Sequence, residues 1–126
     1  MAKILIADDE PDIQEMLTFL LNRVGHEVLH ALNGEEAYRQ ALAELPDVIL
    51  MDVRMPHLDG YEACKLIKAD PALQHIPVIF VSVRNEQTER KVTAELGGAD
   101  YVGKPFSPEA LTRRISEILA QQAASL

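Results

Sequence analysis

Short apolar runs alternate with amphipathic helical segments along the whole chain. Five runs rich in Ile, Val and Leu are bounded by polar or turn residues, which is typical of short strands. The expected strands are residues 3–7, 27–31, 47–51, 77–82 and 99–102. Because a helical segment follows each strand, the pattern predicts an α/β fold in which helices cover both faces of a parallel sheet.

The first helical segment carries the clearest amphipathic pattern. Pro11 lies at its first turn and Gly25 just past its end, as is common at helix starts and stops. Its apolar residues recur at the spacing that places them on one face of a helix. The face predicted to pack on the sheet consists of Ile13, Met16, Leu17, Leu20, Leu21 and Val24.

Two further helices have start signals, and a fourth is unusually polar. Asn33-Gly34 precedes a helix that reaches about Glu44, and Asp59 with Glu62 matches a capping box. In the segment 86–96 only Val92, Ala94 and Leu96 are apolar among many charges. We therefore expect this fourth helix to be held weakly on the sheet and to be a moving part.

The last helix begins at Ser107-Pro108 and fades into a tail rich in alanine and glutamine. Its apolar positions are Leu111, Ile115, Ile118 and Leu119. We expect a single domain over residues 1–121, followed by a frayed tail over residues 122–126.

Length and charge narrow the classes of protein. A chain of 126 residues can bury a core of its own without disulfides or a structural metal. Nucleic acids and anionic bilayers would repel a chain with a formal net charge of −8, so we expect its partners to be proteins. The lone Cys64 has apolar neighbours and is expected in the core, which fits a reducing compartment. No apolar run suits a membrane span or a signal peptide, so a cytoplasmic location is expected.

Residues that can carry chemistry stand where the expected strands end. Asp8 and Asp9 follow the first strand, and Asp52 directly follows the third. Ser82 ends the fourth strand and Lys104 follows the fifth. Right-handed crossovers bring these ends to one edge of the sheet, where such folds bind ligands.

Carboxylates gathered at that edge require positive charge. A close pair repels by roughly 4 kcal/mol at an effective dielectric constant of about 20. Oxygen ligands without imidazole or thiolate suit Mg²⁺, and Lys104 supplies a second positive charge. A carboxylate in such a site can attack phosphorus to form an aspartyl phosphate, while Ser82 hydrogen-bonds a phosphoryl oxygen. Each residue alone has an ordinary explanation as a cap, turn residue or surface charge, but their convergence favours the functional one.

Four segments resemble the receiver domain of bacterial two-component response regulators. They are ADDE at residues 7–10, LMDVRMPHLDG at 50–60, PVIFVS at 77–82 and GADYVGKPF at 98–106. Their mutual spacing also fits, and the resemblance covers essentially the whole chain. It implies a doubly wound (βα)5 flavodoxin-like fold with five parallel strands in the order 2-1-3-4-5. It also implies a signalling switch that catalyses only its own phosphorylation and dephosphorylation, and so is no enzyme in the usual sense.

The same resemblance implies a role for each site residue. Asp52 accepts the phosphoryl group from a sensor histidine kinase. Asp9, Asp52 and the backbone carbonyl of Arg54 hold Mg²⁺, and Asp8 acts through metal-bound water. Lys104 pairs with the phosphoryl group.

A switch and an output surface are also implied. Ser82 moves to the phosphoryl group, and the ring of Tyr101 turns inward into the space it leaves. The Lys104–Pro105 peptide bond is expected to be cis. The fourth helix, fifth strand and fifth helix then control a target protein or an effector domain. Charged residues near this face that could pair across a phosphorylation-dependent homodimer are Arg90, Asp100, Arg113 and Arg114.

Two arginines are expected to flank the phosphoryl pocket. Arg54 and Arg84 stand two residues beyond Asp52 and Ser82. Our hypothesis is that one of them pairs with phosphoryl oxygens and slows or otherwise tunes hydrolysis. The alternative is that both are solvated charges.

Two other classes of protein share part of this pattern. A flavodoxin-like ligand-binding domain has the same sheet topology, but two aspartates after Ala7 would repel a flavin phosphate. A metal-dependent phosphatase with an aspartyl nucleophile is the second class, and such enzymes look as if they need a second acid two residues after the nucleophile. Arg54 occupies that position here, which counts against a phosphatase.

Overall fold

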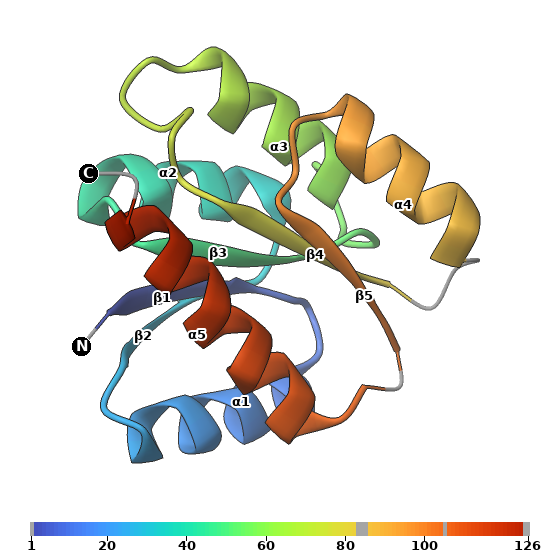
Figure 1. Ribbon diagram of the computed structural model, residues 1–126. Helices are drawn as coiled ribbons and strands as arrows, with labels where there is room; N and C mark the ends of the chain where they lie inside the picture. Colours follow the sequence, from blue (N-terminus) through green and yellow to red (C-terminus); the bar gives the residue numbers. More distant parts are fainter. Residues whose placement is uncertain (1, 83–85, 105, 125–126) are drawn as a thin grey trace.

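Five strands form one parallel sheet, as the sequence predicts. The computed structural model describes residues 2–82, 86–104 and 106–124. Along the sheet the strands lie in the order β2-β1-β3-β4-β5, and every neighbouring pair is parallel (Figure 1). The strands are β1 (Lys3–Ala7), β2 (Glu27–Ala31), β3 (Val48–Asp52), β4 (Val78–Ser82) and β5 (Asp100–Gly103).

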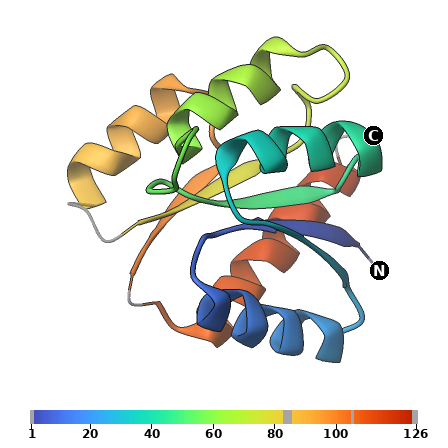
Figure 2. The same cartoon turned by 180° about the vertical axis from the view of Figure 1, so that it is seen from behind.

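Helices cover both faces of the sheet, which makes the fold doubly wound and flavodoxin-like. The helices are α1 (Pro11–Arg23), α2 (Gly34–Glu44), α3 (Gly60–Ala69), α4 (Glu86–Glu95) and α5 (Pro108–Ala124). Two views from opposite sides show α1 and α5 on one face and α2, α3 and α4 on the other (Figures 1 and 2). Across the described part of the chain, no helix combines the length and apolar character that crossing a bilayer requires.

The central strands supply both halves of the core. Successive side chains of a strand point to opposite faces, so Leu5 packs toward α2 and α3 while Ile4 packs toward α1 and α5. Every residue of β3 and β4 is buried, as their continuous apolar sequences predict. Cys64 of α3 lies buried in the same core, as expected.

Three strands have boundaries that differ from the predicted ones by one residue. β3 and β5 lie one residue later than expected, and β4 begins one residue later. The Asp47 backbone N–H donates to the carbonyl of Lys3, and its carboxylate accepts from the Lys3 N–H, so Asp47 precedes the β3 ladder. Asp52 pairs in register with Val81. Asp52 is therefore the last residue of β3 and not the first residue beyond it.

The buried face of α1 differs from the predicted one at two positions, Gln14 within the helix and Val24 just past its end. Val24 is 60 % exposed, because the helix ends at Arg23 and the chain turns away at Gly25, whose φ is 91°. Gln14 is 6 % exposed although its side chain is polar. Leu17 and Leu21 are buried as predicted.

The polar helix α4 has a partly polar inner face. Of the three apolar residues of this segment, Ala94 is exposed, while Val92 and Leu96, the latter just past the helix end, are half-buried. Thr93 is buried, and its hydroxyl has no hydrogen-bond partner among the described residues. This limited apolar contact agrees with the expected weak attachment of α4.

The last helix runs further than the sequence suggests. α5 continues to Ala124, so residues 122–124 of the expected frayed tail are helical, while residues 125–126 lie outside the described part. Leu119 and Gln122 line a shallow pocket together with Pro46 and Pro77, which precede β3 and β4. The end of α5 therefore lies at the amino edge of the sheet, near the start of β1 (Figure 1).

The loop after β3 is held closely between the sheet and two helices. Gly34 and Gly60 donate backbone hydrogen bonds to the carbonyls of Leu58 and Val53. The predicted capping box of Asp59 and Glu62 is present, with both of its hydrogen bonds formed. A Cβ atom on Gly60 would lie only 2.2 Å from the carbonyl oxygen of Asp52. The backbone at the end of β3 thus depends on a glycine eight positions later.

We expect Gly60→Ala to destabilise the protein, because the added methyl group would collide with the Asp52 carbonyl. The free energy of unfolding in urea should fall by about 1–3 kcal/mol, as for other overpacked sites. Gly103→Ala is the matched control, since among the described residues its Cβ would lie no closer than 3.9 Å to a neighbouring atom, an ordinary van der Waals contact. Equal stability of the two variants would contradict the expected collision.

Candidate functional site

The carboxyl edge of the sheet brings together the residues that the sequence selects. Asp9, Asp52, Ser82 and Lys104 line one pocket of about 110 Å³, with Glu10 and Arg54 completing its wall. Asp8 reaches the same place through its contact with Lys104. The convergence predicted from strand order is therefore confirmed.

Lys104 lies at the centre of this arrangement. Its Nζ atom is 3.2 Å from Asp8 Oδ2, 3.1 Å from Glu10 Oε1 and 3.4 Å from Asp52 Oδ2. Its backbone N–H donates to the carbonyl of Ser82, which anchors the end of β5 to β4. One ammonium group thus contacts three carboxylates, two from the loop after β1 and one from the end of β3.

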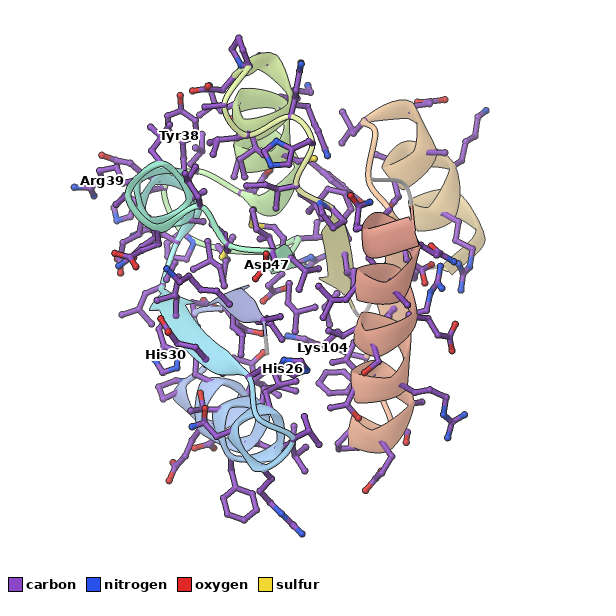
Figure 3. All side chains as sticks on the ribbon, turned by 60° about the vertical axis from the view of Figure 1, so that its left-hand side comes forward. His26, His30, Tyr38, Arg39, Asp47 and Lys104 are labelled. Carbon is purple, nitrogen blue, oxygen red and sulfur yellow. The ribbon has the colours of Figure 1, made fainter. Side chains whose placement is uncertain are left out.

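The burial of Lys104 separates this cluster from ordinary surface ion pairs. Its side chain is 11 % exposed, whereas Arg39 and Glu35 of α2 form a pair with side chains 67 % and 65 % exposed. Arg39 points away from the body of the molecule (Figure 3). Salt screens a largely buried ion pair less than an exposed one, so the Lys104 contacts affect the pKa values of the neighbouring carboxylates more strongly than a surface pair would.

Burial, together with the charge of neighbouring carboxylates, raises the pKa values of Asp8 and Asp52. Burial, followed by the negative charge of Asp8, raises the pKa of Asp52 to about 6. Burial also raises the pKa of Asp8, against the opposing effects of the Glu10 N–H and Lys104. Burial alone would lower the pKa of Lys104, but the charges of Asp52 and Asp8 outweigh it and raise this pKa. The single lysine therefore leaves part of the carboxylate repulsion uncompensated.

The donor set fits a hard divalent cation. One carboxylate oxygen from each of Asp8, Asp9, Glu10 and Asp52 lies within 4.8 Å of the others. These are oxygen ligands only, which Mg²⁺ prefers, and the exposed Asp9 and Glu10 leave the cluster open to solvent.

Sequence reasoning missed Glu10 as a site residue. Its carboxylate contacts Lys104 and belongs to the acidic cluster. The signal was present in the sequence, because Glu10 is the third consecutive acid after an expected buried strand.

Tyr101 is packed inward in this structure. It is 1 % exposed, and its hydroxyl donates a 3.1 Å hydrogen bond to the carbonyl of Ser82. The guanidinium of Arg90 lies 5.9 Å from the centroid of its ring. The two residues expected to form a switch are therefore in direct contact.

Ion pairs within the chain connect the elements of the expected output face. Asp100 of β5 pairs with Arg90 of α4 and with Arg114 of α5. Burial alone would raise the pKa of Asp100, but the hydrogen bond from Arg114 helps to lower it below its ordinary value. Arg113 is exposed on α5. Three of the four residues considered for a dimer interface thus already interact within one chain.

Two other predicted features fall at residues that the structure leaves undescribed. Arg84 and Pro105, the latter with its expected cis bond, lie outside the described residues. Arg54 is described, and it is exposed on the wall of the pocket while its backbone N–H donates to Asp52 Oδ1 at 3.3 Å.

The fold and the site together define an α/β domain with an acidic pocket at its carboxyl edge. Residues 4–116 match the family model described as the response regulator receiver domain, so the chain belongs to this family. It is similar to protein PilH of Pseudomonas aeruginosa, with 40 % identity over 120 residues covering 95 % of this chain and 99 % of PilH. It is also similar to a putative response regulator from Chloroflexus aurantiacus, at 36 % identity and a TM-score of 0.89, covering 94 % and 98 % of the two chains.

Longer relatives contain this domain as one part. The chain is 39 % identical over 117 residues to the alkaline phosphatase synthesis transcriptional regulatory protein PhoP of Bacillus subtilis. The match covers 93 % of this chain but 48 % of PhoP, so the chain spans about half the length of that regulator.

Membership of the family establishes the general role of the chain. A receiver domain acts as a phosphoacceptor in phosphorylation-dependent signalling. The cluster of Asp8, Asp9, Glu10 and Asp52 is typical of the Mg²⁺ site of such domains.

We expect Asp52→Asn to be more stable than the parent protein at pH 7 in the presence of a chelator. The pKa of Asp52 rises from 3.8 to about 6 on folding, so the folded state binds a proton more tightly than the unfolded state. Stability should therefore fall as pH rises from about 4 to above 6, by at most about 3 kcal/mol. Asparagine cannot ionise and avoids this loss. Urea unfolding at pH 4 and pH 7 measures the difference.

The matched control is Glu27→Gln, which alters an exposed acid at the start of β2, at the amino edge of the sheet. Its stability relative to the parent should not depend on pH in the same way. Adding Mg²⁺ should stabilise the parent and narrow its gap from Asp52→Asn. A parent as stable as Asp52→Asn in chelator at pH 7 would contradict the inferred repulsion.

Proposed function

We propose that Asp52 accepts a phosphoryl group from a sensor histidine kinase. The observation that best supports this role is the 3.4 Å contact between Lys104 Nζ and Asp52 Oδ2, beside the buried carboxylate of Asp8. The contact joins the ends of β3 and β5 and places a positive charge beside the candidate nucleophile.

Asp9, Asp52 and the backbone carbonyl of Arg54 would hold Mg²⁺, with Asp8 acting through a water molecule. Mg²⁺ at this site would neutralise negative charge on the transferring phosphoryl oxygens. Burial raises the pKa of Asp52 to about 6. A nearby cation would lower this pKa and so favour the ionised, nucleophilic form of the carboxylate.

In the transfer step, a carboxylate oxygen of Asp52 forms a bond to phosphorus as the phosphorus–nitrogen bond of the donor histidine breaks. Lys104 pairs with the arriving phosphoryl oxygens in exchange for some of its present carboxylate contacts. The hydroxyl of Ser82, which lies on the pocket wall, donates a hydrogen bond to another phosphoryl oxygen.

Output from this event would use α4, β5 and α5. Ser82 and Tyr101 form the switch, and their existing contact supports a direct link between pocket and surface. The three elements follow one another in the chain at the β5 end of the sheet (Figure 1). They would control a target protein or an effector domain, with a phosphorylation-dependent homodimer as one form of output.

The proposed domain comprises residues 1–121, and its proposed location is the cytoplasm. An acidic surface with a net charge of −8 supports protein partners over direct contact with nucleic acid or membrane.

Mass spectrometry tests the central assignment. After incubation with a small phosphodonor and Mg²⁺, the intact parent should gain one phosphoryl group, and Asp52→Ala should gain none. Glu27→Gln should be labelled like the parent, because this acid is exposed at the start of β2, at the opposite edge of the sheet from the pocket. Equal labelling of Asp52→Ala and the parent would exclude Asp52 as the acceptor.

We further propose that Arg54 slows hydrolysis by pairing with phosphoryl oxygens from the pocket wall. Arg54→Ala should then lose its phosphoryl group roughly 5-fold faster, equivalent to the loss of about 1 kcal/mol from an exposed charge pair. Arg39→Ala on the remote surface of α2 is the control. An unchanged rate in Arg54→Ala would exclude this role for Arg54 and leave the same test open for Arg84→Ala.

A further inference from the structure

Gln14 is a buried polar side chain beneath the acidic pocket. It is 6 % exposed, and its Nε2 atom lies 2.9 Å from the carbonyl of Ile6, 3.1 Å from that of Asp8 and 3.0 Å from that of Ala31. These carbonyls lie at the carboxyl ends of β1 and β2. The amide carries two protons, which are shared among three acceptors.

The neighbours of this amide determine its orientation. The reverse orientation would place Oε1 against three carbonyl oxygens. In the observed orientation Oε1 is buried and has no hydrogen-bond partner within the described ranges. An unpaired buried oxygen is unfavourable, and an apolar side chain of similar length would avoid it. The contribution of Gln14 therefore comes from its N–H groups.

Those N–H groups hold the segment that carries three of the four clustered carboxylates. Asp8 follows the last residue of β1, and its carbonyl accepts from the Gln14 side chain. The backbone N–H of Gln14 donates to the carbonyl of Glu10, two residues further along the same segment. Gln14 thus binds residues 8–10 at both ends, while Ala31 ties the side chain to β2.

We propose that Gln14 is a positioning residue for the Mg²⁺ site. It holds the backbone of residues 8–10 in the conformation that directs the carboxylates of Asp8 and Asp9 toward Asp52, and it contacts neither metal nor phosphoryl group. The inference rests on the proposed Mg²⁺-dependent phosphorylation of Asp52 and adds a residue of α1 that acts through the backbone of the acidic segment.

Gln14→Met tests the proposal, because methionine has a similar length and lacks the N–H donors. Isothermal titration calorimetry on the folded proteins should show a Kd for Mg²⁺ about 10-fold higher than in the parent, as when a group that orients a ligand is lost. Labelling by a small phosphodonor should be slower at low Mg²⁺ and should recover at saturating Mg²⁺. A residue that only stabilised the fold would leave the Kd of the folded protein unchanged.

Ile115→Val is the matched control, since it removes a buried methyl group of α5 in the core against α1. It should lower stability with no change in the Kd for Mg²⁺. Parent-like affinity in Gln14→Met, or an equal loss in Ile115→Val, would overturn the positioning role while leaving the proposed function intact. A parent that neither bound Mg²⁺ nor became labelled would overturn both.

The parent protein itself gives a second test, independent of how well Gln14→Met folds. In an NMR spectrum, the two side-chain amide protons of Gln14 should exchange slowly with solvent and should shift when Mg²⁺ is added. Rapid exchange, or resonances that do not respond to Mg²⁺, would overturn the proposal.

Discussion

Repulsion among the carboxylates at one edge of the sheet is the constraint on which the rest of this structure depends. Four acids gather there, and Lys104 contacts three of them from a largely buried position. The parallel strand order makes this possible, because it carries Lys104 to Asp8 across 96 residues of sequence. One ammonium group faces several carboxylates, and burial together with the charge of Asp8 raises the pKa of Asp52 to about 6. The pocket is therefore built to gain free energy from an added cation or from a reaction that redistributes charge.

The backbone carbonyl of Ser82 links this electrostatic cluster to the opposite side of β5. It accepts from the Lys104 N–H at 2.7 Å and from the Tyr101 hydroxyl at 3.1 Å. The ring of Tyr101 in turn lies beneath Arg90, which pairs with Asp100. A continuous set of contacts thus runs from the buried lysine to α4. The inner face of α4 has little apolar surface among its described side chains. It also contains the buried hydroxyl of Thr93, which has no hydrogen-bond partner among the described residues.

The sequence predicts the fold and the convergence of the site well, because both follow from strand periodicity and the handedness of crossovers. Strand boundaries shifted by one residue where side-chain and backbone hydrogen bonds at Asp47 decide where the ladder begins. The burial of Gln14 could not be predicted, because it depends on three carbonyls from two strands that meet only in the folded chain. The inward position of Tyr101 likewise depends on a partner 19 residues away. Glu10 could be predicted as a site residue from its place after two aspartates, but its contact with Lys104 forms only in the folded chain, between residues 94 positions apart.

The position of the end of α5 has a practical consequence. Its final turns lie beside Pro46 and Pro77 at the amino edge of the sheet, on the far side of the molecule from the acidic pocket (Figure 1). A fluorescent reporter or a surface-immobilisation handle joined at that end would leave the entrance to the pocket unobstructed. Entry of a small phosphodonor into the pocket can therefore be followed on tethered protein without steric interference from the attachment.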